Sequence, residues 1–226
     1  MLWLTAAGRC SPRLRSADRL VLDFGGFDPQ SVKGFLSSGD GALLYRYGLK
    51  AAAAGPLLEV GAYCGRSACY LGAAARDAGS RLYSVDHHQG SEEHQPGWEW
   101  HDAELWNAAA GRLDTLPVFL RTIRHAGLEG CVTPVVARSR DAARNWRTPL
   151  ALVFIDGGHS MQAALADWRG WAGHVAPDGY LLIHDVHPVP GDGGRPPMEI
   201  YRRAIASGLF EPAERQEALI ALRRVT

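Results

Sequence analysis

Acidic residues and histidines follow two apolar segments in the second half of the chain. Asp156 ends the segment LALVFID, and His184 and Asp185 end the segment GYLLIHD. If these segments are neighbouring parallel strands, their ends lie roughly 5 Å apart, and two carboxylates that close require a cation. Carboxylates suit Mg²⁺, and a histidine allows Mn²⁺. The spacing predicts a metal site of Asp156, His184 and Asp185; alternatively, Asp156 only caps the following helix.

His159 follows Asp156 by three positions, where a helix is expected to begin. Histidine exchanges protons near neutral pH, so we predict that His159, with Asp156 beside it, takes the proton of a substrate hydroxyl. A role as a metal ligand is the alternative. Asp167 lies two helical turns further on, where we expect it to pack or to form an ion pair.

A second group of residues follows the two strands expected before these. The stretch EVGAYCGRS carries Glu59, Gly61, Gly65 and Ser67, and Asp86 ends the next apolar segment. Glycines in such a turn let a ligand approach a helix N-terminus, and an acid one unit later can bind ribose hydroxyls. The glycines fit neither GxGxxG nor GxxxxGK. Because Glu59 would repel a pyrophosphate, the pattern favours an adenosyl amino acid over a dinucleotide.

Histidines, acids and tryptophans crowd the segment DHHQGSEEHQPGWEWHD, residues 86–102. It leaves directly from Asp86, so we expect His87 to contact the cofactor and the rest to cover the substrate. The predicted substrate contacts are His88, Glu93, His94, Trp98 and Trp100. A solvated surface loop and a metal cage are the alternatives, although irregular spacing and interrupting glycines and proline argue against the cage. A second loop, residues 187–197, is expected to form the opposite wall.

The elements that would position these residues alternate along the chain. Continuous apolar runs predict buried parallel strands at 56–61, 81–86, 131–137, 150–156 and 179–185, with amphipathic helices between them. Two closely spaced strands, 209–215 and 217–225, must then form an antiparallel hairpin. The fold class is α/β, with residues 56–226 as the catalytic domain and residues 1–55 as an N-terminal helical cap or oligomer contact.

Two stretches resemble a known family. LLEVGAYCGRSACYLG resembles the first motif of class I S-adenosylmethionine-dependent methyltransferases, and Asp86 resembles their ribose-binding acid. FIDGGHSMQAALADWRGWAGHVAPDGYLLIHDV is similar to a small bacterial branch that includes sugar and antibiotic O-methyltransferases, although Asp178 replaces a usual glycine. The resemblance covers residues 56–226 and implies a Rossmann-like, seven-stranded, mostly parallel sheet with helices on both faces. It places Arg138 and Ser139 near the adenine, while Ser139 is equally suited to cap a helix.

These observations together predict an S-adenosylmethionine-dependent O-methyltransferase assisted by Mg²⁺ or Mn²⁺. The tryptophan-rich loop and the resemblance favour a sugar hydroxyl as acceptor, in a mannoside, an oligosaccharide, a polysaccharide precursor or a glycosylated natural product. A catechol or phenol is the alternative acceptor. A metal-dependent hydrolase and a non-catalytic adenosyl-binding module are the alternative functions.

Composition limits the partners. The 226 residues contain 24 basic and 24 acidic side chains, so no net charge attracts a nucleic acid or an anionic membrane. The four cysteines lack ligand spacing, which is typical of reduced thiols, and the apolar start is too short for a signal peptide or membrane span. We therefore expect a cytoplasmic protein with a small-molecule or oligosaccharide substrate, and a possible homodimer through the N-terminal segment.

Overall fold

The fold is built on one seven-stranded sheet. The structure is a computed structural model that describes residues 24, 26–187 and 194–225. The strand order is β5-β2-β1-β6-β7-β9-β8, in which the first five strands are parallel and β9 pairs antiparallel with β7 and β8. The strands are β1 (Leu57–Val60), β2 (Leu82–Asp86), β5 (Val132–Val136), β6 (Leu150–Ile155), β7 (Val175–Ile183), β8 (Phe210–Gln216) and β9 (Leu219–Arg224). The predicted α/β class, the parallel strands and the terminal hairpin are confirmed.

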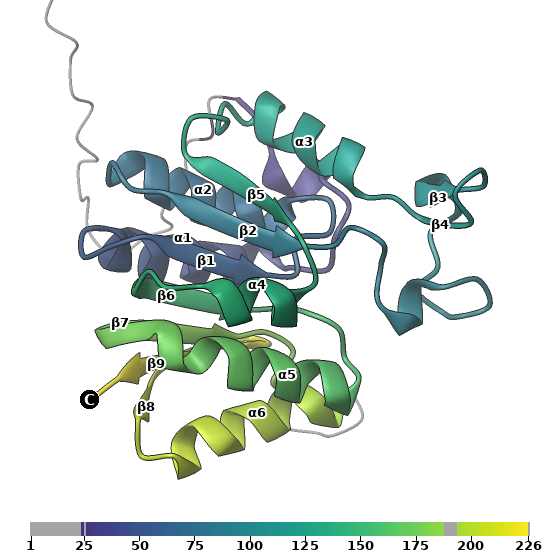
Figure 1. The fold of residues 1–226 in the computed structure, drawn as a ribbon. Coiled ribbons are helices and arrows are strands. Elements are labelled where there is room, and N and C mark those ends of the chain that lie inside the picture. The colour runs from purple at the N-terminus through teal and green to yellow at the C-terminus, as the bar shows by residue number, and fades with distance from the viewer. Residues whose placement is uncertain (1–23, 25, 188–193, 226) are drawn as a thin grey trace, which may run out of the picture.

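Helices cover both faces of the sheet (Figure 1). On one face lie α1 (Ser38–Ala52), α2 (Arg66–Asp77) and α3 (Leu116–His125); on the other lie α4 (Ser139–Asn145), α5 (Met161–Trp171) and α6 (Arg195–Ala206). Successive strand residues point to opposite faces, so Leu57 packs beneath α1 and α2 while Leu58 joins the core beneath α5. The continuous apolar runs of the strands thus supply both cores.

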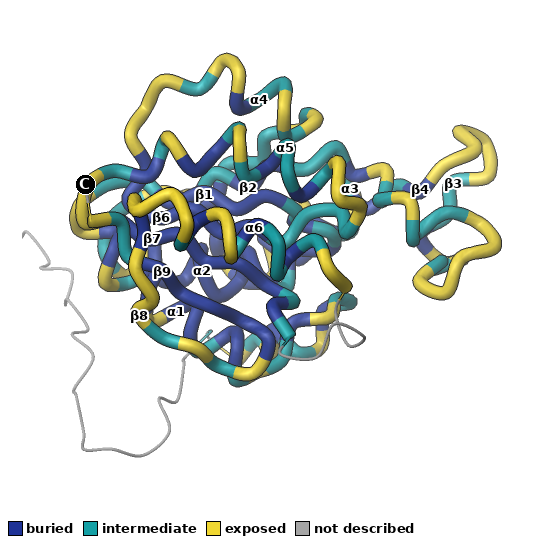
Figure 2. Tube along the Cα trace, turned by 90° about the horizontal axis from the view of Figure 1, so that it is seen from below, coloured by how far each residue is buried: buried dark blue, intermediate teal, exposed yellow. Residues whose placement is uncertain are grey.

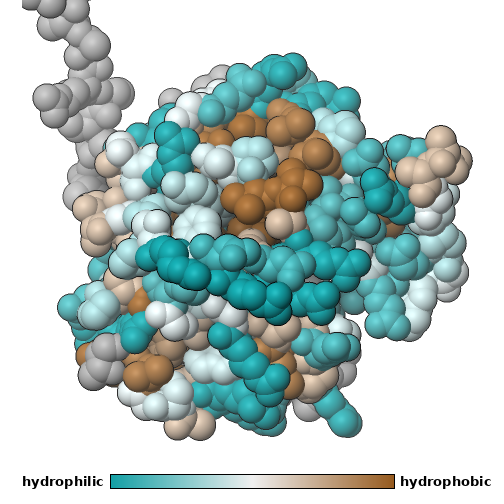
Figure 3. Space-filling view, in the orientation of Figure 1, coloured by the Kyte–Doolittle hydropathy of each residue, from teal (hydrophilic) through white to brown (hydrophobic). Residues whose placement is uncertain are grey.

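The two edge strands each contain a proline. Pro134 lies in β5 and Pro212 in β8, where a register shift follows it. Proline lacks a backbone N–H, so it is tolerated at sheet edges and discourages pairing with another chain. Figure 3 shows hydrophobic side chains reaching the surface around β5, where Val136 is 55% exposed. The edge is therefore apolar but poorly suited to strand addition.

Residues 87–115 form an arm that projects from the carboxyl edge of the parallel strands (Figures 1 and 2). The arm contains two short 3₁₀ helices, Glu92–His94 and Ala103–Leu105, and a small antiparallel pair, β3 (Trp106–Asn107) with β4 (Arg112–Leu113). Lys33 holds the arm by ion pairs with Asp102 at 2.5 Å and Glu104 at 2.6 Å. The segment predicted as a loop is thus an ordered projection beside the expected ligand site.

Helix α1 shares the core of the sheet. Leu43 and Leu44 are fully buried against the layer formed with α2. The cap predicted over residues 1–55 also includes residues 1–23 and 25, which lie outside the described residues, as do residues 188–193 of the predicted second wall. Among the helices of the described chain, none is both long enough and apolar enough to cross a membrane.

Candidate active site

The turn after β1 carries residues predicted to bind the cofactor. Gly61 and Gly65 have φ values of +89° and +95°, which glycine adopts without steric cost. Asp86, at the end of β2, accepts hydrogen bonds through Oδ2 from the backbone N–H groups of Ala62 and Tyr63, each at 2.9 Å. The acid and the glycine turn thus form one unit at the strand ends, where open α/β sheets bind ligands.

Asp86 also fixes the start of the arm. Its Oδ1 accepts the backbone N–H of His88 at 2.7 Å. The His88 side chain is only 2% exposed, with Nδ1 2.8 Å from Thr115 Oγ1, and burial lowers its pKa. His88 therefore anchors the arm in the interior, in contrast to its predicted contact with substrate. His87 is half-buried beside Asp86, and its Nδ1 accepts the backbone N–H of Gln89.

Glu59 and Ser67 lie in the interior beneath the turn. Glu59 is fully buried and accepts hydrogen bonds from Ser67 Oγ at 2.8 Å and Ser84 Oγ at 2.5 Å. Burial raises the pKa of Glu59 to about 8, against the opposing effect of the two hydroxyl donors. Both residues were predicted as cofactor contacts; the structure places them where they bind strand β1 to β2 and to helix α2.

A Glu59→Gln substitution should change the pH dependence of stability. The pKa of Glu59 is about 8 in the folded protein, against an ordinary value of 4.5. The contribution of Glu59 to stability is therefore full below pH 4.5 and is lost as the pH rises through 8. We expect the variant to match the wild type near pH 5 and to exceed it by roughly 2–5 kcal/mol near pH 8.5. Urea unfolding at both pH values measures the difference; parallel curves would contradict the prediction.

Arg138 and Ser139, the residues predicted near the adenine, lie in different surroundings from each other. Arg138 is exposed and stands at the N-cap of α4, so Ser139 is the first helical residue rather than the cap. Ser139 Oγ donates to Asp167 Oδ1 at 2.5 Å and accepts from Trp171 Nε1 at 2.8 Å. Burial raises the pKa of Asp167 to about 6. Asp167 is buried, as expected of a packing residue, and through Ser139 both Asp167 and Trp171 tie α5 to α4.

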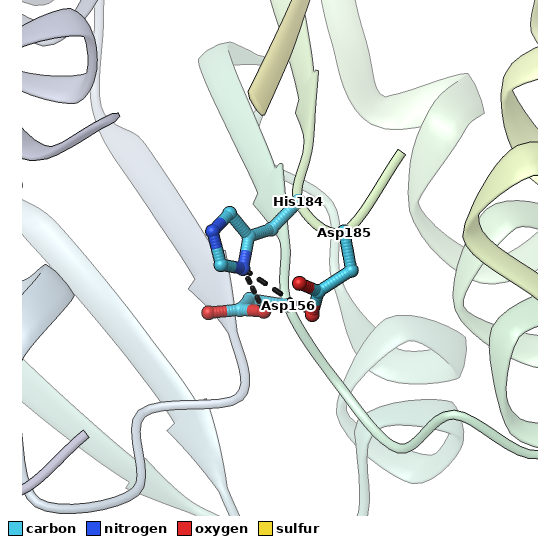
Figure 4. A group of neighbouring side chains, drawn as sticks. All are labelled: Asp156, His184 and Asp185. Atoms are coloured by element: carbon cyan, nitrogen blue, oxygen red, sulfur yellow. Dashed lines mark hydrogen bonds and ion pairs between the residues drawn. The ribbon is translucent and has the colours of Figure 1, made fainter. Parts of the chain in front are cut away.

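Asp156, His184 and Asp185 come together at the carboxyl ends of β6 and β7 (Figure 4). Nδ1 of His184 lies 3.1 Å from Asp156 Oδ1 and 3.4 Å from Asp185 Oδ2. One donor atom of each residue lies within 4.8 Å of the other two. Burial alone would lower the pKa of His184, but the charge of Asp156 and hydrogen bonds to the carboxylates raise it well above 6.5. The cluster therefore attracts positive charge.

The donor set fits a divalent ion. Two carboxylates and an imidazole are ligands for Mn²⁺ and related ions, and carboxylates also suit Mg²⁺. A cavity of about 10 Å³ borders Asp156, His159 and His184, close to the smallest that holds one water. Ser160, rather than Asp156, caps α5, since Ser160 Oγ accepts the N–H of Ala163 at 3.2 Å. The capping alternative for Asp156 is thus wrong.

His159 lies between two carboxylates. Its Nε2 is 3.0 Å from Asp185 Oδ2, and its Nδ1 is 3.2 Å from Glu93 Oε1 in the arm. Hydrogen bonds to Asp185 and Glu93 raise the pKa of His159 to about 10. Glu93 was predicted as a substrate contact. Through His159 it joins the arm to Asp185 of the metal-ligand cluster, which consists of Asp156, His184 and Asp185.

Aromatic rings gather where the arm meets the body. His94 stacks on Tyr63 with ring centroids 5.3 Å apart, and Phe35 lies 5.9 Å from Tyr63 and 5.1 Å from Trp100. Trp98 and Trp100 are about half exposed, at 55% and 49%. Of the predicted substrate contacts, the structure brings together Glu93, His94 and Trp100 beside the site.

The site also contains Asp40, Phe35 and Tyr63, which were not predicted from the sequence. Asp40 Oδ2 lies 3.5 Å from His184 Nε2, although 144 positions separate the two residues. The only signal for Asp40 in the sequence is its position, three residues after the capping residue Ser37. Tyr63 lies inside the glycine turn, so its aromatic side chain there was an available signal.

Comparison with known proteins agrees with this geometry. A family model described as a methyltransferase domain matches residues 58–186, more than half of the chain. The O-methyltransferase TomG from Streptomyces achromogenes, involved in tomaymycin synthesis and solved with S-adenosylmethionine, is 14% identical, with a TM-score of 0.60 over 85% of this chain and 82% of that chain. The O-methyltransferase NovP is 15% identical, with a TM-score of 0.63 over 82% and 79%.

A third structure has the same fold. A Staphylococcus aureus protein proposed to be a caffeoyl-CoA O-methyltransferase is 10% identical, with a TM-score of 0.60 over 86% of this chain and 87% of that chain. The family match spans the glycine turn, Asp86, Asp156, His184 and Asp185. The chain therefore belongs to the methyltransferase domain family and has the fold of the class I S-adenosylmethionine-dependent methyltransferases.

Proposed function

We propose that this protein is an S-adenosylmethionine-dependent O-methyltransferase that acts on a phenol or catechol with the help of a divalent ion. The observation that carries the proposal is the contact between the glycine turn and the metal-ligand cluster. The turn approaches so closely that a β-carbon at Gly61 would overlap the carbonyl oxygen of Asp156. A cofactor bound at the turn and a hydroxyl held near Asp156 would then be neighbours.

Different residues of the site would have different roles in the reaction. The acceptor oxygen attacks the methyl carbon, the carbon–sulfur bond breaks, S-adenosylhomocysteine leaves, and the hydroxyl proton passes to a base. Asp86 and the turn would orient the cofactor, which lowers the entropic barrier. Asp156, His184 and Asp185 would hold the ion, whose charge would lower the pKa of a nearby hydroxyl. The arm, in contact with His159 through Glu93, would exclude water.

A phenolic acceptor has more support than the sugar expected from the sequence. Both ring nitrogens of His159 face carboxylates, which leaves no free nitrogen for a proton from the acceptor in this conformation. Phenols have a pKa of about 10 and need a weaker base than sugar hydroxyls do. The rings of Phe35, Tyr63 and Trp100 offer stacking partners for an aromatic acceptor. The caffeoyl-CoA assignment of the Staphylococcus aureus protein points the same way.

Calorimetric titration with S-adenosylhomocysteine tests the cofactor site. We expect the wild type to bind S-adenosylhomocysteine and Asp86→Ala to bind it approximately 100-fold more weakly. The substitution would remove the two charge-assisted hydrogen bonds that Asp86 is expected to accept from the ribose hydroxyls. Glu129→Ala, which removes an exposed carboxylate between α3 and β5, should bind as the wild type does. If the folded wild type bound no S-adenosylhomocysteine, the whole proposal would fail.

An acceptor screen tests the substrate class. Methyl-labelled S-adenosylmethionine is incubated with catechols, simple phenols and mannosides, each with Mg²⁺, with Mn²⁺ or with a chelator. We expect labelled catechol or phenol products that disappear with the chelator and return with metal. Labelling of mannosides alone would reject the phenol and leave the methyltransferase. Full activity in the chelator would remove the ion from the proposal.

A further inference from the structure

A buried carboxylate outside the predicted site lies behind His184. Asp40 is in the first turn of α1 and is 2% exposed. Its Oδ2 lies 3.5 Å from His184 Nε2, and its Oδ1 is buried without a hydrogen-bond partner among the described residues. An isolated buried carboxylate is costly, so such a group normally has a charged or hydrogen-bonding counterpart. Among the described residues, the imidazole of His184 is the charged counterpart of Asp40.

The opposite edge of the same imidazole faces the metal-ligand cluster. His184 Nδ1 points toward Asp156 and Asp185, at 3.1 and 3.4 Å (Figure 4). The ring is only 4% exposed and packs edge-on against Phe154, with centroids 6.4 Å apart. Asp40 behind the ring and the two acids in front of it therefore fix which nitrogen faces the cluster. This is the arrangement in which a carboxylate orients a histidine that binds a metal.

We infer that Asp40 is a positioning residue that holds His184 Nδ1 toward Asp156 and Asp185, so that a divalent ion is bound by one nitrogen and two carboxylates. The inference rests on the proposed metal-assisted function and deepens it. An imidazole ligand favours Mn²⁺ and neighbouring transition metals over Mg²⁺, which prefers oxygen. The N-terminal segment, through α1, thereby contributes to the selectivity of the site.

A role in helix stability alone does not account for Asp40. An acid in the first turn interacts favourably with the helix dipole, but that interaction requires no burial. Asp141 holds the equivalent first-turn position of α4 and is half exposed, with arginines beside it. Asp40 is instead removed from solvent and paired with His184. The two acids form a matched pair for an experiment.

Mn²⁺ binding to the full-length protein tests the inference without any assay of activity. Protein freed of metal is titrated with Mn²⁺, and free Mn²⁺ is followed by electron paramagnetic resonance. We expect Asp40→Asn to weaken Mn²⁺ binding at least about tenfold, and Asp141→Asn to leave it unchanged. Circular dichroism and S-adenosylhomocysteine binding check that both variants are folded. In the wild type, spin-echo modulation from ¹⁴N should reveal the His184 nitrogen on bound Mn²⁺.

Three outcomes would overturn the inference. Equal Mn²⁺ affinity in the wild type and Asp40→Asn would reject Asp40 as a positioning residue and leave the proposed function intact. Bound Mn²⁺ without a ¹⁴N signal in the wild type would reject His184 as a ligand. If the wild type bound no Mn²⁺, the inference and the metal part of the proposed function would both fail, while S-adenosylhomocysteine binding would still decide the methyltransferase.

Discussion

Gly61→Ala is expected to destabilise the protein by more than about 4 kcal/mol, enough to abolish soluble expression. A β-carbon at position 61 would overlap the carbonyl group of Asp156 and lie 3.0 Å from the backbone nitrogen of Gly157. These atoms belong to the backbone after β6 and cannot move aside as a flexible side chain would. The φ of +89° adds strain for any residue with a β-carbon. Soluble yield and urea unfolding measure the loss.

Gly79→Ala is the matched control. Gly79 also has a positive φ, +68°, but a β-carbon there would have no atom within 4 Å. Substitution of Gly79 should therefore lower the free energy of unfolding by about 1 kcal/mol, which is the penalty for a residue with a β-carbon in the left-handed conformation. If both variants lost the same stability, the close contact between the turn and Asp156 would be refuted, and with it the observation that carries the proposed function.

The positions of the parallel strands could be predicted because each strand is a continuous, mainly apolar run. The largest difference in a strand boundary is at β7, which was expected from residue 179 and begins at Val175. The stretch VAPDG has the composition of a turn, but Val175 pairs with Leu150 before a register shift restores the ladder at Tyr180 and Leu152. Such an irregularity depends on the partner strand, so local sequence does not reveal it.

The candidate site was predictable where it depends on strand ends and unpredictable where it depends on register or distant contacts. Asp86 ends β2, Asp156 directly follows β6, and His184 and Asp185 directly follow β7. Their meeting therefore follows from the topology of the sheet. Glu59 was expected to face the ligand, but pairing of β1 with β2 sets it beside Ser84, in the interior. The partnership of Asp40 with His184 depends on how α1 packs on the sheet, which no local pattern encodes.

The largest effect on activity is expected from Asp156→Ala. Loss of one carboxylate would remove a predicted ligand and leave His184 Nδ1 with Asp185 alone. A loss of about 4 kcal/mol of transition-state stabilisation corresponds to about a 10³-fold decrease in kcat/KM. S-adenosylhomocysteine affinity should change little, because Asp86 and the glycine turn remain. Steady-state kinetics with the best acceptor of the screen, with calorimetry alongside, measure both quantities.

The Asp156→Asn variant tests whether Asp156 binds a metal or has only a structural role. An amide oxygen can still bind a metal, although more weakly than a carboxylate, so high Mn²⁺ should restore part of the activity of Asp156→Asn and none of that of Asp156→Ala. A carboxylate that only accepted a hydrogen bond from His184 would give a different result. Both variants would then show activity independent of Mn²⁺ concentration, and the metal-ligand role of Asp156 would be rejected.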